Sequence, residues 1–162
     1  MLPKAETAKR YLKRYTGRLN KMTGDDMALK AVIFDMDGVI VDSEPEYQRV
    51  EMEMVKKFDA SVTLDHLKEY TGIDSITMWA RIRERFNLPQ TAEELCREEE
   101  RLMREYYKSG ELKVIEPTVS LIKAAHKKGC RTGIASASGK ENIADVLRRL
   151  NIGDYVEAAV SG

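Results

Sequence analysis

The sequence has no apolar run that approaches the roughly 20 residues needed to cross a bilayer, and its N-terminus has no apolar signal core. Basic and acidic residues number 27 each, so a net charge of zero gives no reason to expect a nucleic-acid or membrane partner. Cysteine is scarce: Cys96 and Cys130 lie far apart and outside any metal-binding spacing, which argues against a zinc site or a disulfide. We therefore expect a cytoplasmic protein without nucleic-acid or membrane partners, and the sequence leaves the oligomeric state open.

Residues 1–26 differ from the rest of the chain because their basic side chains outnumber the acidic ones. Tyr11, Leu12, Tyr15 and Leu19 recur near helical spacing, which predicts a basic amphipathic helix. Such a helix could be an arm for nucleic acid or membranes, or simply an appended helix, and we favour the second interpretation. Apolar residues make up 43% of the whole chain, which is enough for a packed core, so we expect a folded protein after this extension.

The chain after the extension changes between strand-like and helical patterns. Residues 31–34 form a short continuous apolar run, which is typical of a strand covered on both faces in a parallel sheet. Residues 46–107 carry several helical patterns with no strand between them, which indicates an inserted helical bundle. A helix, a second strand at 132–135, another helix and a third strand at 156–160 follow. This order predicts an α/β fold with a Rossmann-like parallel sheet, incomplete at three strands, and an inserted helical domain.

Two acids, Asp35 and Asp37, stand at the end of the first predicted strand and are followed by Gly38. In open α/β sheets, ligands bind beyond the carboxyl ends of the strands. Two carboxylates this close repel one another unless a cation or a proton intervenes, and hard oxygen ligands suit Mg²⁺. One carboxylate can attack phosphorus as a nucleophile, and the other can act as general acid and base. Gly38 would let the backbone approach a phosphate closely.

A bare Asp-x-Asp pattern is short and common, and alone it would indicate a turn with a solvated acid. Here residues 32–45 read VIFDMDGVIVDSEP without a gap, and this stretch resembles the first motif of the haloacid dehalogenase superfamily. The similarity is greatest to the branch of β-phosphoglucomutases and phosphoglycolate-type phosphatases, and it covers residues 27–162. The resemblance implies that Asp35 is the nucleophile and Asp37 the general acid and base. It also implies that the Asp35 side chain and the Asp37 backbone carbonyl hold Mg²⁺.

The same resemblance implies a division into domains. Residues 27–45 and 108–162 would form a partial α/β core, and residues 46–107 a helical cap that closes over the substrate. Residues 1–26 would be an extension outside this plan. The implied substrate is a small phosphorylated metabolite. The loops of the cap decide which one, and their substrate preference cannot be read from the sequence.

Residues 134–138 resemble the family's second motif, a strand that ends in serine or threonine. The resemblance implies that Ser136 hydrogen-bonds a phosphoryl oxygen. The turn that follows opens a helix, whose N-terminal amides favour anions, so Ala137, Ser138 and Lys140 complete the expected phosphate site. Alone, such a turn would indicate a helix N-cap, and its position after the helical insertion favours the functional interpretation.

Members of this family continue beyond the third strand with a lysine that neutralises phosphate charge and acids that complete the metal shell. The sequence ends at Gly162, before either, so we expect a truncated gene product, a fragment or a partial sequence. Three functions stay open. A Mg²⁺-dependent phosphatase that forms an aspartyl-phosphate agrees best with the motifs. Ser75 counts against a phosphomutase, because it stands where β-phosphoglucomutase has an arginine. The third function is a non-catalytic remnant that binds Mg²⁺ or phosphate weakly.

Overall fold

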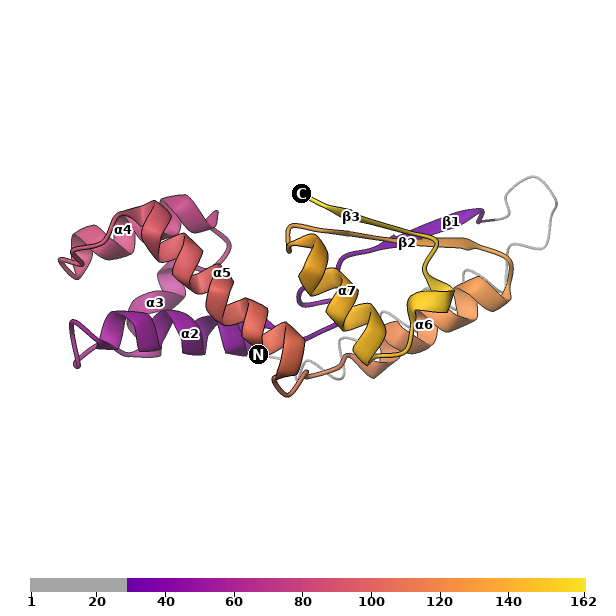
Figure 1. Cartoon of the computed structure of the whole chain (residues 1–162), viewed down its shortest axis with the longest axis horizontal. Coiled ribbons are helices and arrows are strands. Elements are labelled where there is room, and N and C mark those ends of the chain that lie inside the picture. Colours follow the sequence, from indigo (N-terminus) through magenta and orange to yellow (C-terminus); the bar gives the residue numbers. More distant parts are fainter. Residues whose placement is uncertain (1–28) are drawn as a thin grey trace. The chain divides into compact units, whose positions relative to one another are not determined.

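The computed structural model describes residues 29–162, so the predicted basic helix within residues 1–26 lies outside the described residues. The described chain forms two compact units. Residues 29–41 and 114–162 form the first, here named the sheet unit, and Asp42–Lys113 forms the second, here named the helical unit. All strands of the described residues belong to the sheet unit (Figure 1). The assignment of functional core and cap domains stays a prediction.

The sheet unit contains three parallel strands, β1 (Ala31–Phe34), β2 (Arg131–Ser136) and β3 (Ala158–Ser161). Their order in the sheet is β1-β2-β3, which is also their order in the chain. Phe34 is paired with Ile134, so the carboxyl ends of β1 and β2 lie side by side. The predicted α/β fold with a parallel sheet and an inserted helical region is confirmed.

Two helices, α6 (Glu116–Lys127) and α7 (Lys140–Arg149), lie on the same face of this sheet (Figure 1). Pro117 stands in the first turn of α6, where its missing N–H costs no hydrogen bond. Gly129 follows the end of α6 with a φ of +80°, a conformation that glycine adopts without strain. The buried apolar residues between helices and sheet include Phe34, Val119, Ile122, Ile134, Ile143 and Val146.

The opposite face of the sheet is exposed in the part of the chain that the structure describes. Ile33 on β1 is 73% exposed and Val160 on β3 is 62% exposed. The expectation that residues 31–34 are covered on both faces is therefore wrong for the described residues. The reason is topological: successive right-handed crossovers in one direction along a sheet place their helices on the same side.

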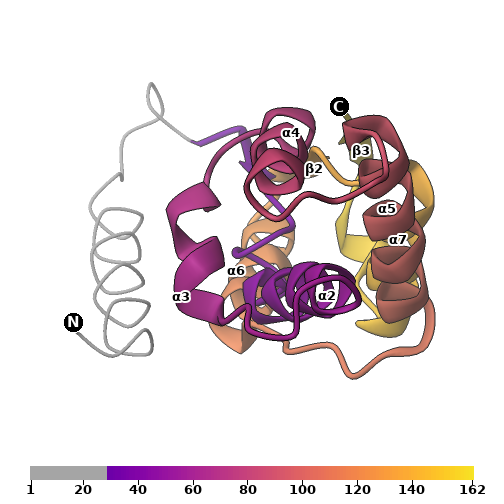
Figure 2. The same ribbon diagram turned by 90° about the vertical axis from the view of Figure 1, so that its left-hand side faces the viewer.

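The helical unit contains four α-helices and one 3₁₀-helix, namely α2 (Glu44–Lys56), α3 (Leu64–Leu67), η1 (Lys68–Tyr70), α4 (Ser75–Arg85) and α5 (Ala92–Ser109). The longest helix, α5, packs against both α2 and α4, and Figure 2 shows these three helices from the end of the unit. Within residues 29–162, no helix has the length and apolar composition needed to cross a bilayer.

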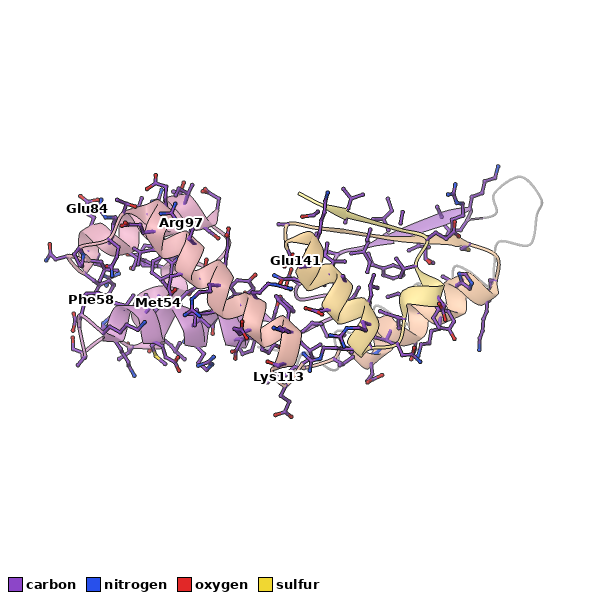
Figure 3. The ribbon with its side chains drawn as sticks, in the orientation of Figure 1. Met54, Phe58, Glu84, Arg97, Lys113 and Glu141 are labelled. Carbon is purple, nitrogen blue, oxygen red and sulfur yellow. The ribbon has the colours of Figure 1, made fainter. Side chains whose placement is uncertain are left out.

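The first helix of this unit ends earlier than its apolar pattern predicts. Val50, Met54 and Phe58 share one helical face in the sequence, but α2 ends at Lys56. The backbone N–H of Phe58 donates to the carbonyl of Val55 at 2.9 Å, which tightens the final turn. Phe58 consequently leaves the buried face and is 46% exposed, whereas Met54 is 3% exposed (Figure 3).

Candidate active site

The loop after β1 is closed by backbone hydrogen bonds around a buried methionine. Asp35 follows the last residue of β1, Asp37 lies two residues further, and Met36 between them is fully buried. The carbonyl of Met36 accepts from the N–H of Val41 at 3.0 Å, and the N–H of Gly38 donates to the carbonyl of Val41 at 2.7 Å. These contacts fix the backbone that carries both acids.

Gly38 has a φ of +70°, in the left-handed region that favours glycine. Beyond its two chain neighbours, no heavy atom of the described residues lies within 4 Å of the position that a Cβ would take there, so crowding is not the reason for glycine. The backbone conformation of the turn is sufficient to explain this residue. Its predicted contact with phosphate stays a prediction.

Asp35 is exposed at the end of β1, and its Oδ1 accepts a hydrogen bond of 2.7 Å from the N–H of Met36. This bond orients the carboxylate relative to the strand. The other carboxylate oxygen, Oδ2, is then the one that could face a ligand beyond the sheet edge.

Asp37 is half-buried and contacts the two serines of the second motif. Its Oδ2 accepts hydrogen bonds from the hydroxyl of Ser138 at 2.8 Å and from that of Ser136 at 3.2 Å. The N–H of Ser138 in turn donates to the hydroxyl oxygen of Ser136 at 3.0 Å. Both serines are buried, at 7% and 8% exposure. The structure therefore brings the two motifs together, through Asp37 rather than through Asp35.

The remaining predicted phosphate-site residues lie on the same loop. Ala137 is exposed between the two serines, and Lys140 is the exposed first residue of α7, directly after Gly139 at the N-cap. The first turn of α7 therefore follows the serines immediately, and the free N–H groups of such a turn favour an anion.

Two residues that the sequence interpretation missed support this loop. The hydroxyl of Ser161, at the end of β3, donates to the carbonyl of Ser138 at 2.9 Å. The N–H of Gly162 donates to the carbonyl of Ser136, also at 2.9 Å. The sequence contains a pattern that could have indicated Ser161, namely a serine directly after an apolar run, as at Ser136. Since the carboxyl ends of parallel strands meet at one edge of the sheet, such a serine is expected near the same site.

The acids of the first motif have the chemistry that Mg²⁺ requires. The carboxylate of Asp35 and the carbonyl and carboxylate of Asp37 are all hard oxygen ligands. Residues 29–162 hold no group of three or more His, Cys, Asp and Glu side chains that could bind a metal ion. A Mg²⁺ ion here would complete its shell with water and phosphate oxygens, which this ion commonly does.

Comparison with known proteins identifies the family. The model of the haloacid dehalogenase-like hydrolases matches residues 29–162, which is most of the chain. The chain belongs to the haloacid dehalogenase-like hydrolases. The resemblance recognised in the first motif is thereby confirmed. Among curated proteins, none matches the sequence significantly.

Several solved structures share the fold. β-Phosphoglucomutase of Clostridium difficile has a TM-score of 0.58 and 21% identity, over 82% of this chain and 61% of that chain. CbbY of Rhodobacter sphaeroides, solved with phosphate, has a TM-score of 0.63 and 16% identity, over 83% and 64% of the two chains. YfnB of Bacillus subtilis, solved with magnesium, has a TM-score of 0.60 and 13% identity, over 81% and 64%. The chain thus spans less than two thirds of the length of these haloacid dehalogenase-like proteins.

Proposed function

We propose that the sheet unit carries the nucleophile half of a Mg²⁺-dependent phosphatase site for small phosphorylated metabolites, with Asp35 as the nucleophile. The observation that carries this proposal is the pair of hydrogen bonds from Ser136 and Ser138 to Asp37, beside an exposed Asp35 at the end of β1. A nucleophile, a general acid and two hydroxyl donors thus share one edge of a parallel sheet, where ligands of such sheets bind.

In the first step, Oδ2 of Asp35 attacks phosphorus and forms a new P–O bond. The bond between phosphorus and the ester oxygen breaks, and that oxygen leaves with the electron pair. Asp37 in its protonated form donates the proton that the leaving oxygen takes up. The hydroxyl of Ser136, which donates to Asp37 in the free protein, would donate to a phosphoryl oxygen in the complex.

In the second step, water attacks the phosphorus of the aspartyl-phosphate. Asp37 accepts the proton of this water, the bond between Asp35 and phosphorus breaks, and inorganic phosphate leaves. The Asp35 carboxylate and the protonated Asp37 are restored, so atoms and charges balance over the cycle.

Mg²⁺ bound by Asp35 and the Asp37 carbonyl would offset the charge of the phosphoryl oxygens. Support for this choice comes from the all-oxygen donor set and from two relatives of similar fold, one solved with phosphate and the other with magnesium. The helical unit, Asp42–Lys113, would serve as the cap that selects the substrate.

The test is phosphate release from an aryl phosphate by the whole chain, with and without Mg²⁺. We expect release that requires Mg²⁺, stops on chelation and is lost in Asp35→Asn, which keeps the size of the side chain but removes its nucleophilic charge. Asp154→Asn removes an exposed acid elsewhere in the sheet unit and serves as the matched control with unchanged release.

Four outcomes contradict the proposal. Release that persists in Asp35→Asn excludes this residue as nucleophile, and release that survives chelation excludes the metal. A folded wild-type chain that releases no phosphate excludes phosphatase activity for this chain. Isomerised sugar phosphate without net phosphate release would indicate a phosphomutase instead.

A further inference from the structure

The helical unit contains a carboxylate in its core that the proposed phosphatase chemistry does not use. Glu99 stands between Leu95 and Met103 on the buried face of α5, and at 3% exposure it is as buried as these apolar neighbours. Glutamate is almost never fully buried unless it is paired. Glu99 therefore requires a group that compensates its charge.

Within residues 29–162, the groups that act on Glu99 include hydrogen-bond donors and no cation. Trp79 on α4 is fully buried, and neither its Nε1 nor the Oε1 of Glu99 has a hydrogen-bond partner within the described residues. Burial is the main cause that raises the pKa of Glu99 to about 7, whereas the Ser75 hydroxyl and the Trp79 indole, which lies near the carboxylate but outside hydrogen-bond geometry, oppose the rise. The charge of Glu100, the next residue on α5, is a smaller contribution to the same rise.

A second carboxylate approaches from the neighbouring helix. Glu51 lies on α2, which packs against α5, and it is half-buried beside the core residues Val50 and Met54. Burial first, and then the charges of Glu99 and Glu44, raise the pKa of Glu51 to about 8. The charge of Glu99 therefore acts on Glu51 across the α2–α5 contact.

The pKa of the Cys96 thiol is shifted by the same carboxylate. Cys96 lies on α5, one turn before Glu99, and its pKa is raised to about 11 by burial first and by the charge of Glu99 next. The titratable groups that act on this centre from α2, α4 and α5 are thus acids and a thiol, with Glu44, Asp74, Glu93 and Glu100 at its margins.

Two charged carboxylates that share a buried space need a proton or a metal ion between them. A metal is disfavoured because residues 29–162 hold no group of three or more metal-ligating acidic, thiol or imidazole side chains. A proton needs no further ligand, and a protonated carboxyl can also donate a hydrogen bond.

We propose that Glu51 and Glu99 form a proton-binding pair in the core of the helical unit, so that this unit folds with uptake of a proton and loosens as the pH rises. The direction of this pH dependence follows from the difference in proton binding between the folded and the unfolded chain. The unfolded chain releases the protons near the ordinary value of 4.5, whereas the folded unit holds them to about pH 7 and 8. Stability therefore falls as the pH rises between these limits and is level above them.

A carboxyl-carbon NMR titration of the whole chain with labelled glutamate tests the pair directly. We expect two carboxyl signals that titrate well above the ordinary value, one of which disappears in Glu51→Gln and the other in Glu99→Gln. In Glu99→Gln, the remaining late signal moves to lower pH because the like charge is gone. Glu105→Gln, an exposed position on the same helix, leaves both late signals in place. A folded wild-type chain whose glutamates all titrate near the ordinary value overturns the proposal.

Urea unfolding between pH 5 and 9 gives an independent readout. The wild-type midpoint should fall as the pH rises, Glu51→Gln and Glu99→Gln should each flatten this dependence, and Glu105→Gln should keep it. An unchanged slope in both pair variants overturns the proposal. If a pair variant does not fold, the wild-type titration decides.

Discussion

The hydroxyl of Ser138 donates a 2.8 Å hydrogen bond to Oδ2 of Asp37 and joins two loops that lie 101 residues apart in the chain. This hydrogen bond is largely shielded from water because Ser138 is buried, and a hydrogen bond is stronger where the local dielectric constant is low. It holds the proposed general acid at the carboxyl edge of the sheet. The position of Asp37 therefore depends on the second motif as well as on its own loop.

We predict that Ser138→Ala destabilises the protein by about 1 to 3 kcal/mol, because Oδ2 of Asp37 loses the donor at the buried end of this hydrogen bond. Urea unfolding measures this cost. We also expect Asp37 to be less well positioned for catalysis. If the transition state loses a similar free energy, kcat/KM for phosphate release falls by roughly tenfold or more. Ser138→Thr keeps the hydroxyl and should recover most of both. Ser109→Ala removes a serine hydroxyl that bonds the carbonyl of Glu105 at the exposed end of α5, and it should change neither. Equal stability and equal kcat/KM of the alanine and threonine variants would contradict the role of the Ser138 hydroxyl in holding Asp37.

We also predict that Gly38→Ala destabilises the protein by about 1 to 2 kcal/mol, because alanine has to adopt the left-handed φ of +70°. Space is not limiting at this position, so the effect isolates the backbone cost. Gly153→Ala is the matched control, since a Cβ there also meets no atom of the described residues within 4 Å beyond the chain neighbours, and its φ lies outside the left-handed region. Thermal unfolding of both variants measures the difference. A Gly38→Ala protein as stable as Gly153→Ala would show that this turn relaxes to another conformation.

The sheet could be predicted from the sequence because its strands are short apolar runs with polar ends. The run at residues 31–34 coincides with β1, and the run at 132–135 lies within β2. The rule that ligand sites gather at the carboxyl ends of parallel strands then placed Asp37 and Ser136 together, as the structure has them.

Other features depend on contacts that no local pattern contains. Which of the two acids accepts a hydrogen bond from Ser136 is decided by the turn around the buried Met36, and the spacing of the two acids in the motif does not reveal it. The exposed face at Ile33 follows from the order of the strands, which an apolar run does not reveal. Glu99 was overlooked because charged residues are normally assigned to the outer face of a helix, whereas this one stands on the buried face of α5.

A final prediction separates metal binding from catalysis, which matters because the alternative of a non-catalytic remnant also includes weak Mg²⁺ binding. A ligand that binds the folded protein alone stabilises it by RT ln(1 + [L]/Kd), about 2.7 kcal/mol at a hundredfold excess over Kd. We expect Mg²⁺ to raise the melting temperature of the wild-type chain in a concentration-dependent manner, and phosphate to increase this rise because the metal shell takes phosphate oxygens.

Asp35→Asn should abolish the Mg²⁺-dependent rise, because the variant replaces a charged oxygen ligand by a neutral amide. The control Asp154→Asn, which changes an exposed acid of the same unit, should keep the full rise. A rise of equal size in both variants would mean that Mg²⁺ binds elsewhere on the surface. A wild-type chain that gains no stability from Mg²⁺ at any concentration would contradict the metal site, because an ion held at the end of β1 must by mass action favour the folded state.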